Sequence, residues 1–355
     1  MMTSERSDFP KNIFFPNRQM KILITGASGF IGSYMVERAL QEGHEVWAAV
    51  RATSSRKYLT DERIRFIEQD LGHAERLTGQ LADHFGQHGA FDGVIHAAGA
   101  TKCRHAEDFF RINADGTRLL ASTLLATGAL RKDGRFVFIS SLSAFGPVHE
   151  QDDQPISETD FPRPDTAYGC SKLAAEAALK EMEGLNYVVL RPTGVYGPRE
   201  RDYFMMAQSI KRHVDFAVGY KPQYLTFIYV DDLVSAAMLA LTRGKSGRAY
   251  FVSDGDTYSS RTFSLLLQKE LGVKGVAHIV APLWVLRAVS WVAERLARLS
   301  HSTSTLNSDK YRIMRQRNWR CDIQPAHEEL GYEPQWPLQR GVKAAVAWYK
   351  ANHWL

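Results

Sequence analysis

The chain has 355 residues, a net charge of +5 and 45% hydrophobic residues. This length suits two domains, and the composition is that of a globular protein rather than a disordered or fibrous one. The three cysteines lie far apart, which excludes a disulfide framework and a cysteine-based zinc site and suits a reducing compartment.

The first segment, residues 1–19, is polar and contains two prolines, which predicts a disordered leader. Met20 stands directly before the first predicted strand and is a candidate for the biological start. No signal peptide or membrane span is expected, because the most apolar later stretch, Val276–Ala293, is interrupted by a histidine, a proline and an arginine. The histidines form no HExxH pattern, so we expect no metal site. Because neither a signal peptide nor a membrane span is expected, we also expect a cytoplasmic protein.

From Lys21 onward, short β-branched runs alternate with helical stretches. The predicted strands are Lys21–Thr25, Glu45–Val50, Ile64–Glu68, Phe91–His96, Phe136–Ser140 and Tyr187–Arg191. The helices between them include Phe30–Gln41, Ala106–Thr127 and Ala167–Met182. Such alternation predicts an α/β fold: a doubly wound parallel sheet of the Rossmann type over residues 20–190.

After Arg191, prolines and glycines interrupt the pattern. Two further strands, Leu225–Val230 and Ala249–Val252, indicate that residues 225–253 return to the sheet, with Asp231 or Asp232 capping the intervening helix. The remaining predicted helices are Phe204–Arg212, Arg261–Leu271, Leu283–Leu299, Asp309–Arg315 and Leu338–Asn352. Residues 191–224 and 254–355 are therefore expected to form a smaller, mainly helical substrate-binding part.

The segment Leu283–Leu299 is amphipathic, with a valine stripe that includes Val289 and Val292 and a polar side that includes Arg287 and Ser290. We expect the stripe to pack on the substrate domain; an interfacial helix is the alternative. From Arg287 to Arg320, eight Lys or Arg stand against two acids. No nucleic-acid motif accompanies them, so we interpret them as a solvated face and expect no nucleic-acid partner.

A glycine-rich loop follows the first strand and opens the first helix. Glycines here permit a tight turn and let backbone N–H groups approach a pyrophosphate. The candidate contacts are Gly26, Ser28, Gly29, Phe30, Ile31 and Gly32. The spacing G-x-x-G-x-x-G resembles the extended branch of the short-chain dehydrogenase/reductase superfamily, also known as the NAD-dependent epimerase/dehydratase family. This resemblance covers nearly the whole chain from Met20.

The end of the second strand carries Arg51, with two serines, Arg56 and Lys57 shortly after it and no carboxylate before Asp61. Cations and hydroxyls suit the 2′-phosphate of NADP, which is the preferred cofactor. NAD remains the alternative, with Arg51 stacked on the adenine.

The resemblance implies further cofactor contacts at the ends of later strands. Asp70 and Leu71 match an adenine-binding pair, and Ala97, Ala98 and Gly99 match a loop that lines the ribose. Tyr168, Lys172 and Pro192 are assigned to the cofactor on the same basis. His96, directly before the second group, is interpreted as a packed residue at a strand end.

The catalytic candidates begin with Tyr168-x-x-x-Lys172, which places both side chains on one helix face. We expect the Lys172 ammonium to lower the pKa of Tyr168, which then transfers a proton while the nicotinamide transfers a hydride. The resemblance implies a third member, Ser141, that orients the substrate oxygen. Ser140 is expected to be structural, and Asn113 either supports the site or bonds to its own helix.

The type of reaction depends on residues around this triad. The acidic pair of dehydratases is replaced by Leu142 and Ser143, which argues against elimination. Many nucleotide-sugar epimerases clamp the diphosphate with an arginine where this chain has Leu225, although Lys211, Arg212 or Lys221 could substitute. The stretch Gly26–Arg51 resembles dihydroflavonol and 3β-hydroxysteroid reductases instead. Candidate apolar wall residues are Phe145, Tyr196, Tyr203, Phe204, Met205 and Met206.

We therefore expect an NAD(P)-dependent oxidoreductase that interconverts a ketone and a secondary alcohol on a small hydrophobic substrate. A nucleotide-sugar epimerase with bound NAD is the alternative, and a non-catalytic, cofactor-sensing regulator is a third hypothesis. The resemblance also implies a homodimer that pairs the helices Ala106–Thr127 and Ala167–Met182.

Overall fold

A computed structural model describes residues 19–152, 154–299 and 308–355. Apart from Gln19, the predicted leader lies outside the described residues.

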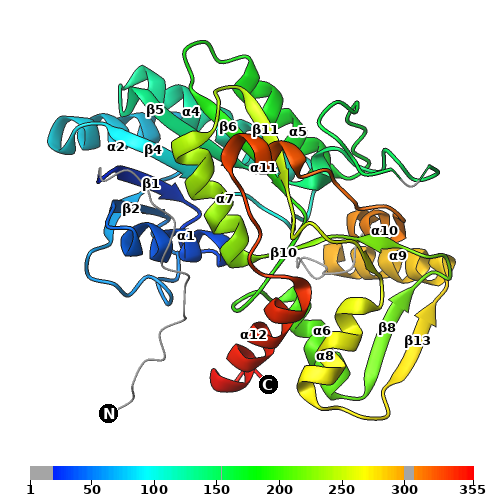
Figure 1. The fold of residues 1–355 in the computed structure, drawn as a ribbon. Coiled ribbons are helices and arrows are strands. Elements are labelled where there is room, and N and C mark those ends of the chain that lie inside the picture. Colours follow the sequence, from blue (N-terminus) through cyan, green and yellow to red (C-terminus); the bar gives the residue numbers. More distant parts are fainter. Residues whose placement is uncertain (1–18, 153, 300–307) are drawn as a thin grey trace, which may run out of the picture.

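A parallel sheet of seven strands forms the centre of the molecule, in the order β11-β6-β5-β4-β1-β2-β3 (Figure 1). The strands are β1 (Lys21–Thr25), β2 (Glu45–Val50), β3 (Arg65–Glu68), β4 (Phe91–His96), β5 (Leu130–Ile139), β6 (Tyr187–Pro192) and β11 (Arg248–Val252). The chain winds from β1 outward to β3, returns to β4 beside β1, and continues outward in the other direction. This is the predicted doubly wound Rossmann-type fold, which is confirmed. Of the two later segments expected to return to this sheet, only Ala249–Val252 does so, within β11, whereas Leu225–Val230 pairs outside it.

Helices cover both faces of the sheet. They are α1 (Phe30–Gln41), α2 (Ala74–His88), α3 (Ala106–Phe109), α4 (Gly116–Ala126), α5 (Ala167–Lys180), α7 (Val230–Arg243) and α11 (Gln324–Leu330). Alternate residues of β1 face opposite ways: Ile22 and Ile24 join the core under α1 and α7, and Leu23 joins the core under α2, α4 and α5. The sheet is therefore packed between two separate apolar cores, one on each face.

Two helical predictions need correction. The stretch predicted as one helix contains α3, a π-helix over Phe110–Asp115 and α4. Helix α7 begins at Val230 with Tyr229 as its N-cap, so neither aspartate caps it. The Asp232 carboxylate instead accepts hydrogen bonds from the backbone N–H groups of Gln335 and Trp336, both at 2.9 Å, and thereby fixes the approach to the last helix.

The smaller part of the molecule contains helices and short strands. Its elements are β7 (Gly194–Tyr196), α6 (Asp202–Lys211), β8 (Val214–Val218), β9 (Tyr224–Leu225), β10 (Phe227–Tyr229), β12 (Tyr258–Ser259), α8 (Thr262–Leu271), β13 (Ala277–Ala281), α9 (Leu283–Leu299), α10 (Ser308–Arg315) and α12 (Leu338–Ala351). Strands β8 and β13, which the sequence pattern did not indicate, pair in parallel through five residues each.

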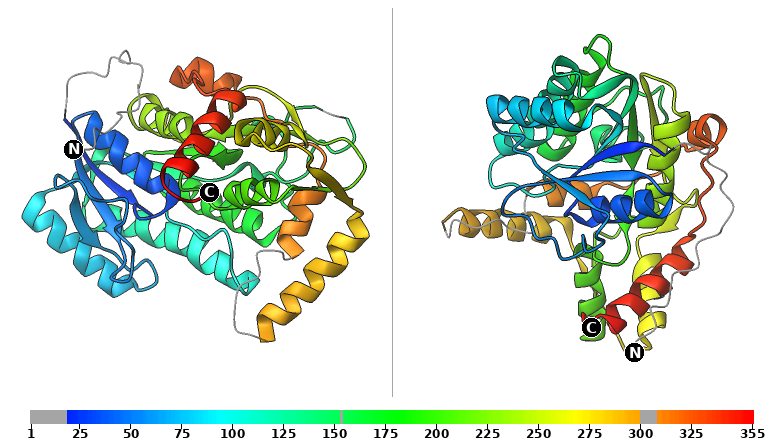
Figure 2. Two further views of the ribbon diagram at one scale, coloured as in Figure 1. Left: turned by 90° about the horizontal axis from the view of Figure 1, so that it is seen from below. Right: turned by 90° about the vertical axis from the view of Figure 1, so that its left-hand side faces the viewer.

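Helix α9 projects from the body of the molecule (Figure 2). Val289 and Val292, expected to be covered, are 49% and 47% exposed, whereas Ser290 on the expected polar side is only 2% exposed. The predicted orientation of this helix is therefore wrong. Apolar residues occupy most of its circumference, so the valine stripe alone did not determine which side packs inward. Within the described ranges, no helix is long and apolar enough to cross a membrane.

Candidate active site

The glycine loop between β1 and α1 lies directly against the end of β4. Gly26 has a φ of +68°, and a Cβ atom there would lie 2.7 Å from the main chain of Ala97. Gly29 is the N-cap of α1, no side chain caps this helix end, and its first turn has no acidic residue. The loop thus leaves a positive helix terminus open in a closely packed turn, and this arrangement fits the pyrophosphate of a dinucleotide.

His96 lies behind this loop and joins three elements. Its ring nitrogens contact the hydroxyls of Thr25 at 2.6 Å and Thr117 at 2.9 Å. The Thr25 hydroxyl also accepts a hydrogen bond from the backbone N–H of Ala98 at 3.3 Å. Burial lowers the pKa of His96 to about 3, so the ring is neutral at physiological pH. These contacts assign His96 a packing role beside the glycine loop.

Ser141 and Tyr168 lie together at the carboxyl end of the sheet. Ser141 directly follows β5, where it is the N-cap of a short 3₁₀-helix and accepts a hydrogen bond from the N–H of Ser143 at 3.1 Å. Tyr168 lies in the first turn of α5, which the Thr166 hydroxyl caps. The Ser141 and Tyr168 side chains are close enough for Ser141 to lower the pKa of the Tyr168 phenol. Two of the three predicted catalytic side chains therefore lie side by side.

Lys172 lies one turn farther along α5 and is 5% exposed. Its ammonium donates a hydrogen bond to the carbonyl oxygen of Ile139 at 2.9 Å. A Cβ atom on Gly99 would lie 3.3 Å from this ammonium, so the predicted ribose loop passes close to Lys172. The glycine at this position permits that close approach.

Asn113 ties the same loop to α5 from within the π-helix. Its Oδ1 accepts a hydrogen bond from the N–H of Ala100 at 2.7 Å, and its Nδ2 donates to the Ala100 carbonyl and to the Ser171 hydroxyl, both at 3.0 Å. All of these partners lie outside its own helix. The geometry therefore matches the site-supporting interpretation of Asn113 rather than the helix-bonding one, and π-helical turns are often found at functional sites.

The pKa of Tyr168 differs in direction from the sequence-based expectation. Burial raises it, and the neighbouring Ser141 side chain opposes that rise. Burial also lowers the pKa of Lys172 to about 8, while Glu176 opposes this change. The expected lowering of the Tyr168 pKa by Lys172 is absent because the ammonium is directed to the Ile139 carbonyl. In the protein alone, Tyr168 is a protonated acid at neutral pH.

Ser140 belongs to a buried ionic network behind the site. Its hydroxyl donates a hydrogen bond to the Glu176 carboxylate, which forms an ion pair with Arg191 at 2.7 Å. The Arg191 guanidinium lies 4.5 Å from the ring centre of Phe145 and 5.3 Å from that of Phe251. These contacts hold β6 against α5 and leave Ser141 as the serine that faces Tyr168.

The segment after β2 is exposed and basic. The backbone N–H of Arg51 donates to the Ser54 hydroxyl at 3.0 Å, and the Arg56 guanidinium lies 4.2 Å from the ring centre of Phe66. The sheet also brings Glu68 opposite Val50, next to Arg51. This carboxylate was not found from the sequence, because only the parallel register of β2 and β3 makes it a neighbour. Its proximity is relevant to the choice between NADP and NAD.

The adenine-side candidates lie at the end of β3. The Asp70 carboxylate accepts hydrogen bonds from the N–H of Gly72 at 3.0 Å and from the His73 ring at 2.7 Å, and the first contact lowers its pKa most. Leu71 packs against the core beneath α4. Ala97 and Ala98 meet the glycine loop as described, and Pro192 is the last residue of β6.

A cavity of about 360 Å³ opens beside Ser141 and is shared between the sheet and the smaller part. Its walls combine the strand ends with residues of α6, β8, β9, α8 and α10. The lining residues are Ser141, Leu142, Ser143, Pro192, Thr193, Gly194, Tyr203, Met206, Phe216, Ala217, Val218, Gln223, Leu225, Thr226, Phe227, Ser260, Phe263, Ile313, Met314 and Trp319. Among the described residues, none that lines this cavity carries a charged side chain.

Some predicted wall residues line this cavity and others do not. Tyr203 and Met206 are part of the wall, as is Leu225. Phe145 and Tyr196 are instead fully buried in the core, with exposed fractions of 2% and 0%. Phe204 packs against Tyr349 and Trp354, and Met205 faces outward. The position of each residue in its strand, helix or loop, rather than its apolar character, decides whether it reaches the cavity.

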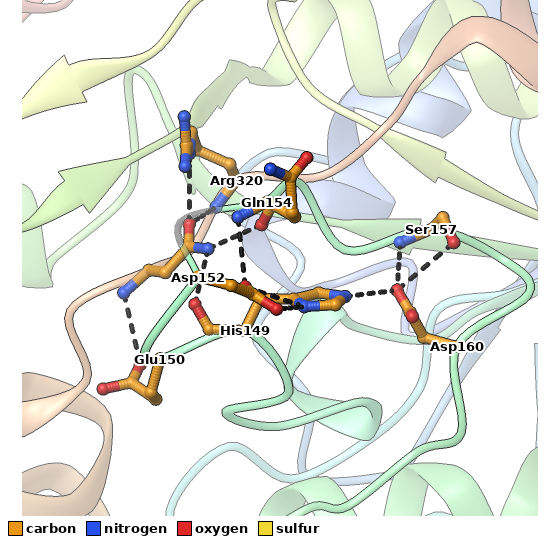
Figure 3. Close-up of polar contacts among 8 residues, drawn as sticks. His149, Glu150, Asp152, Gln154, Ser157, Asp160 and Arg320 are labelled. Atoms are coloured by element: carbon orange, nitrogen blue, oxygen red, sulfur yellow. Dashed lines mark hydrogen bonds and ion pairs between the residues drawn. The ribbon is translucent and has the colours of Figure 1, made fainter.

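Polar contacts connect the loop between β5 and α5 to the segment before Trp319, a residue of the cavity wall (Figure 3). We call His149, Glu150, Asp152 and Asp160, which form these contacts, the strap. The His149 ring contacts the Asp152 carboxylate at 3.0 Å and the Asp160 carboxylate at 3.0 Å. The Glu150 carboxylate accepts hydrogen bonds from the N–H groups of Arg317 and Asn318. Because Trp319 follows directly in the chain, these contacts fix one wall of the cavity.

Comparison with known proteins agrees with this architecture. Residues 22–253 match the model of the NAD dependent epimerase/dehydratase family. Ceramide reductase of Caulobacter vibrioides is 27% identical over 336 residues, which cover 94% of this chain and 96% of that protein. GDP-6-deoxy-D-mannose reductase of Pseudomonas aeruginosa is 30% identical over 264 residues, which cover 70% and 79% of the two chains.

The fold also matches solved structures of this group. UDP-glucose 4-epimerase of Thermotoga maritima superposes with a TM-score of 0.74 at 23% identity, over 94% of this chain and 100% of that one. The sheet topology, the glycine loop and the family match together give one conclusion. The chain belongs to the NAD-dependent epimerase/dehydratase family, within the extended short-chain dehydrogenases/reductases.

Proposed function

We propose that this protein is an NADP-preferring reductase that converts an uncharged, hydrophobic ketone to a secondary alcohol. The observation that carries the proposal is the cavity beside Ser141, whose described lining includes no charged side chain. A nucleotide sugar carries a diphosphate, and burying it beside that lining without a cationic partner would be costly. An apolar carbonyl compound suits such walls.

Lys211, Arg212 and Lys221, the residues considered as substitutes for an arginine clamp, are absent from the cavity lining. The relative named ceramide reductase, whose name indicates a lipid substrate, matches nearly the full chain. Both observations support a hydrophobic substrate.

The two halves of the reaction, proton transfer and hydride transfer, can be assigned to different groups. In this proposal Ser141 donates a hydrogen bond to the substrate oxygen and holds it beside Tyr168, which donates the proton to that oxygen. The bound cofactor supplies the hydride to the carbonyl carbon. The raised pKa of Tyr168 keeps the phenol protonated, which favours the direction in which it acts as an acid. Asn113 holds the loop at Ala100 in position, and the Lys172 ammonium lies close to Gly99 in the same loop.

The proposal includes the cofactor preference and the quaternary structure. Arg51 and the basic segment after it support NADP, and Glu68 beside Val50 is the local feature that favours NAD. We also propose a homodimer that pairs α4 and α5 across a twofold axis, and a cytoplasmic location. Sedimentation velocity of the full chain tests the dimer.

The alternative function is a nucleotide-sugar epimerase with bound NAD. It is favoured by the similarity to GDP-6-deoxy-D-mannose reductase, whose name indicates a nucleotide-sugar substrate. The third hypothesis, a cofactor-sensing regulator, is opposed by the presence of both Tyr168 and Lys172 in the first turns of α5.

The test combines binding with turnover. The NADPH-loaded protein is melted with UDP, dTDP, GDP or CDP, and a panel of hydrophobic ketones is screened for oxidation of NADPH and NADH. We expect ketone-dependent oxidation that is faster with NADPH, and no nucleotide that raises the melting temperature. A clear rise with one nucleotide, together with no ketone turnover, would replace the proposal by the epimerase function.

A further inference from the structure

Helix α9 and the neighbouring α10 form a surface that differs from the rest of the described molecule. Trp284 and Trp291 are 73% and 58% exposed, and Val289 and Val292 beside them are about half exposed, at 49% and 47%. Apolar side chains of this size on adjacent turns of one helix form an exposed patch rather than scattered surface residues. We call Trp284, Val289, Trp291 and Val292 the α9 patch.

Arginines surround the α9 patch. Arg287, Trp291 and Arg295 follow one another at four-residue spacing and therefore lie along one side of the helix, and the Arg295 guanidinium is 5.2 Å from the Trp291 ring centre. Across from them, Arg312 and Arg315 of α10 have side chains that are 46% and 47% exposed. The surface is thus both aromatic and cationic.

A hollow of about 610 Å³ lies between the two helices. Trp284, Arg287 and Trp291 line it from α9, and Tyr311, Arg312 and Arg315 line it from α10. The hydroxyl of Ser290, a residue that is 2% exposed and also lines the hollow, has no hydrogen-bond partner within the described part of the chain. The hollow therefore presents guanidinium and hydroxyl donors between aromatic rings.

Two carboxylates that contact these arginines, among the side chains that the structure describes, are held in ion pairs. Asp165 forms an ion pair with Arg315 at 3.2 Å, and its side chain is 22% exposed. Asp309 lies 3.6 Å from Arg312, and its side chain is 16% exposed. Both are more covered than the arginines they contact, so the outward-facing charge of this surface is positive.

The hollow beside the α9 patch lies next to the substrate cavity. Helix α10 separates the two spaces: its Ile313 and Met314 line the cavity, and its Tyr311 and Arg312 line the hollow. On the other side, Phe216 of β8 lines the cavity and is 64% exposed. A flat partner seated on α9 would therefore lie beside the entrance to the cavity.

We propose that α9, together with α10, docks this protein on the surface of a bilayer that contains anionic phospholipids. Tryptophans prefer the boundary between headgroups and acyl chains, and arginines bind the phosphates of anionic lipids. A second copy of the chain fits this surface less well, because a twofold contact through α9 would place the arginines of the two copies near each other. The helix lies in the interface and does not span the membrane.

The test uses the full chain and vesicles of defined composition. Co-sedimentation is measured with vesicles of phosphatidylcholine alone and of phosphatidylcholine and phosphatidylglycerol in equal parts, in low and in high salt. We expect binding to the anionic vesicles that weakens in high salt, because salt screens the arginines. Trp284→Ser with Trp291→Ser should reduce binding at least tenfold, and Arg287→Gln about fivefold.

Phe85→Ser is the matched control, because Phe85 is 44% exposed and belongs to α2, which lies on the opposite side of the molecule from α9 (Figure 1). This control should bind like the unaltered protein, and all variants should keep their melting temperature and their affinity for NADPH. Equal vesicle binding by the double tryptophan variant, or no binding to anionic vesicles in low salt, would overturn the proposal. Self-association that is lost in the tryptophan variant would assign the surface to a second copy instead. Because vesicle binding is measured without turnover, its result is independent of the proposed reductase activity.

Discussion

The two sides of the active-site cleft are built in opposite ways. On the sheet side, Asn113, Ser171, Lys172 and the loop around Ala100 form a buried polar network in which the hydrogen bonds are 2.7–3.0 Å long. On the other side, α6, α8 and α10 contribute an apolar wall to a cavity without a charged residue among its described lining. The contrast suggests that one side fixes the chemistry and the other selects the substrate, and each prediction below tests this division.

The largest effect is expected on the polar side. Tyr168→Phe removes the proton donor and should reduce kcat about 10²–10⁴-fold. The Kd for NADPH should change much less than kcat, because the Tyr168 hydroxyl is only one of many predicted contacts with the cofactor. Tyr220→Phe, at a residue that is 75% exposed, is the control. Full turnover by the Tyr168 variant would contradict the assignment of chemistry to this side.

The glycine loop allows a matched pair of variants. Gly26 and Gly43 both have positive φ angles, +68° and +82°, but only at Gly26 would a Cβ atom meet other atoms within 4 Å. Gly43→Ala should cost about 1 kcal/mol of the free energy of unfolding, and Gly26→Ala about 2–5 kcal/mol. Urea unfolding measures both, and NADPH titration should show lost binding only for the Gly26 variant. Equal losses would mean that the close contact with Ala97 contributes nothing.

The apolar wall is tested by adding a charge. Leu225→Arg places a guanidinium in the charge-free cavity and should lower kcat/KM for a hydrophobic ketone about 10–100-fold. It should also increase the affinity for UDP, which calorimetry can measure. Leu225→Met conserves the volume and is the control. A variant that turns over ketones normally would show that Leu225 does not contact the substrate.

The pH dependence should reflect Lys172. As pH rises through about 8, this buried group loses its proton, and kcat/KM for reduction should fall. Because its pKa is lower in the folded state than in the unfolded chain, the charged form opposes folding, and stability should rise between pH 8 and the ordinary lysine range. Lys172→Arg should shift the fall in kcat/KM to higher pH, and Lys172→Met should abolish the rise in stability. If kcat/KM of the arginine variant falls at the same pH as before, the titration belongs to another group.

The smallest effect is expected at the strap. Asp152 and then Asp160 raise the pKa of His149, with burial opposing them. The contribution of this histidine to stability is therefore present in acid and is lost as pH rises through the raised pKa. At pH 6, His149→Asn should have a lower melting temperature than the unaltered protein, which corresponds to a loss of less than about 1 kcal/mol in the free energy of unfolding. At pH 9 the two proteins should melt at the same temperature. A constant difference across this range would indicate packing rather than charge.

The sequence was most informative where chemistry is local. The glycine spacing and the alternation of strands and helices predicted the Rossmann-type sheet, because each signal is contained within a short stretch. The π-helix around Asn113, which interrupts the predicted helix between α3 and α4, was not predictable, since a π-helix leaves no periodic signal of its own. Glu68 became visible only through the register of β2 and β3.

Side-chain environments were the other source of error. The direction of the Tyr168 pKa depends on burial and on where the Lys172 ammonium points, and neither follows from the spacing of the two residues. The orientation of α9 was missed for a similar reason: its apolar residues surround the helix, and only the folded body shows which strip is covered.

The π-helix at Phe110–Asp115 has a consequence for how this protein can change. A π-turn places one residue more in a single revolution than an α-turn does, so α3 and α4 keep nearly the relative rotation that an uninterrupted helix would give them. Deleting one residue there would therefore leave Leu120 and Leu124 in the core but would remove the wider turn from which Asn113 bonds to Ala100. The segment thus points a site-facing side chain away from the regular helical path without moving the packing face behind it. A deletion there should accordingly reduce activity much more than stability.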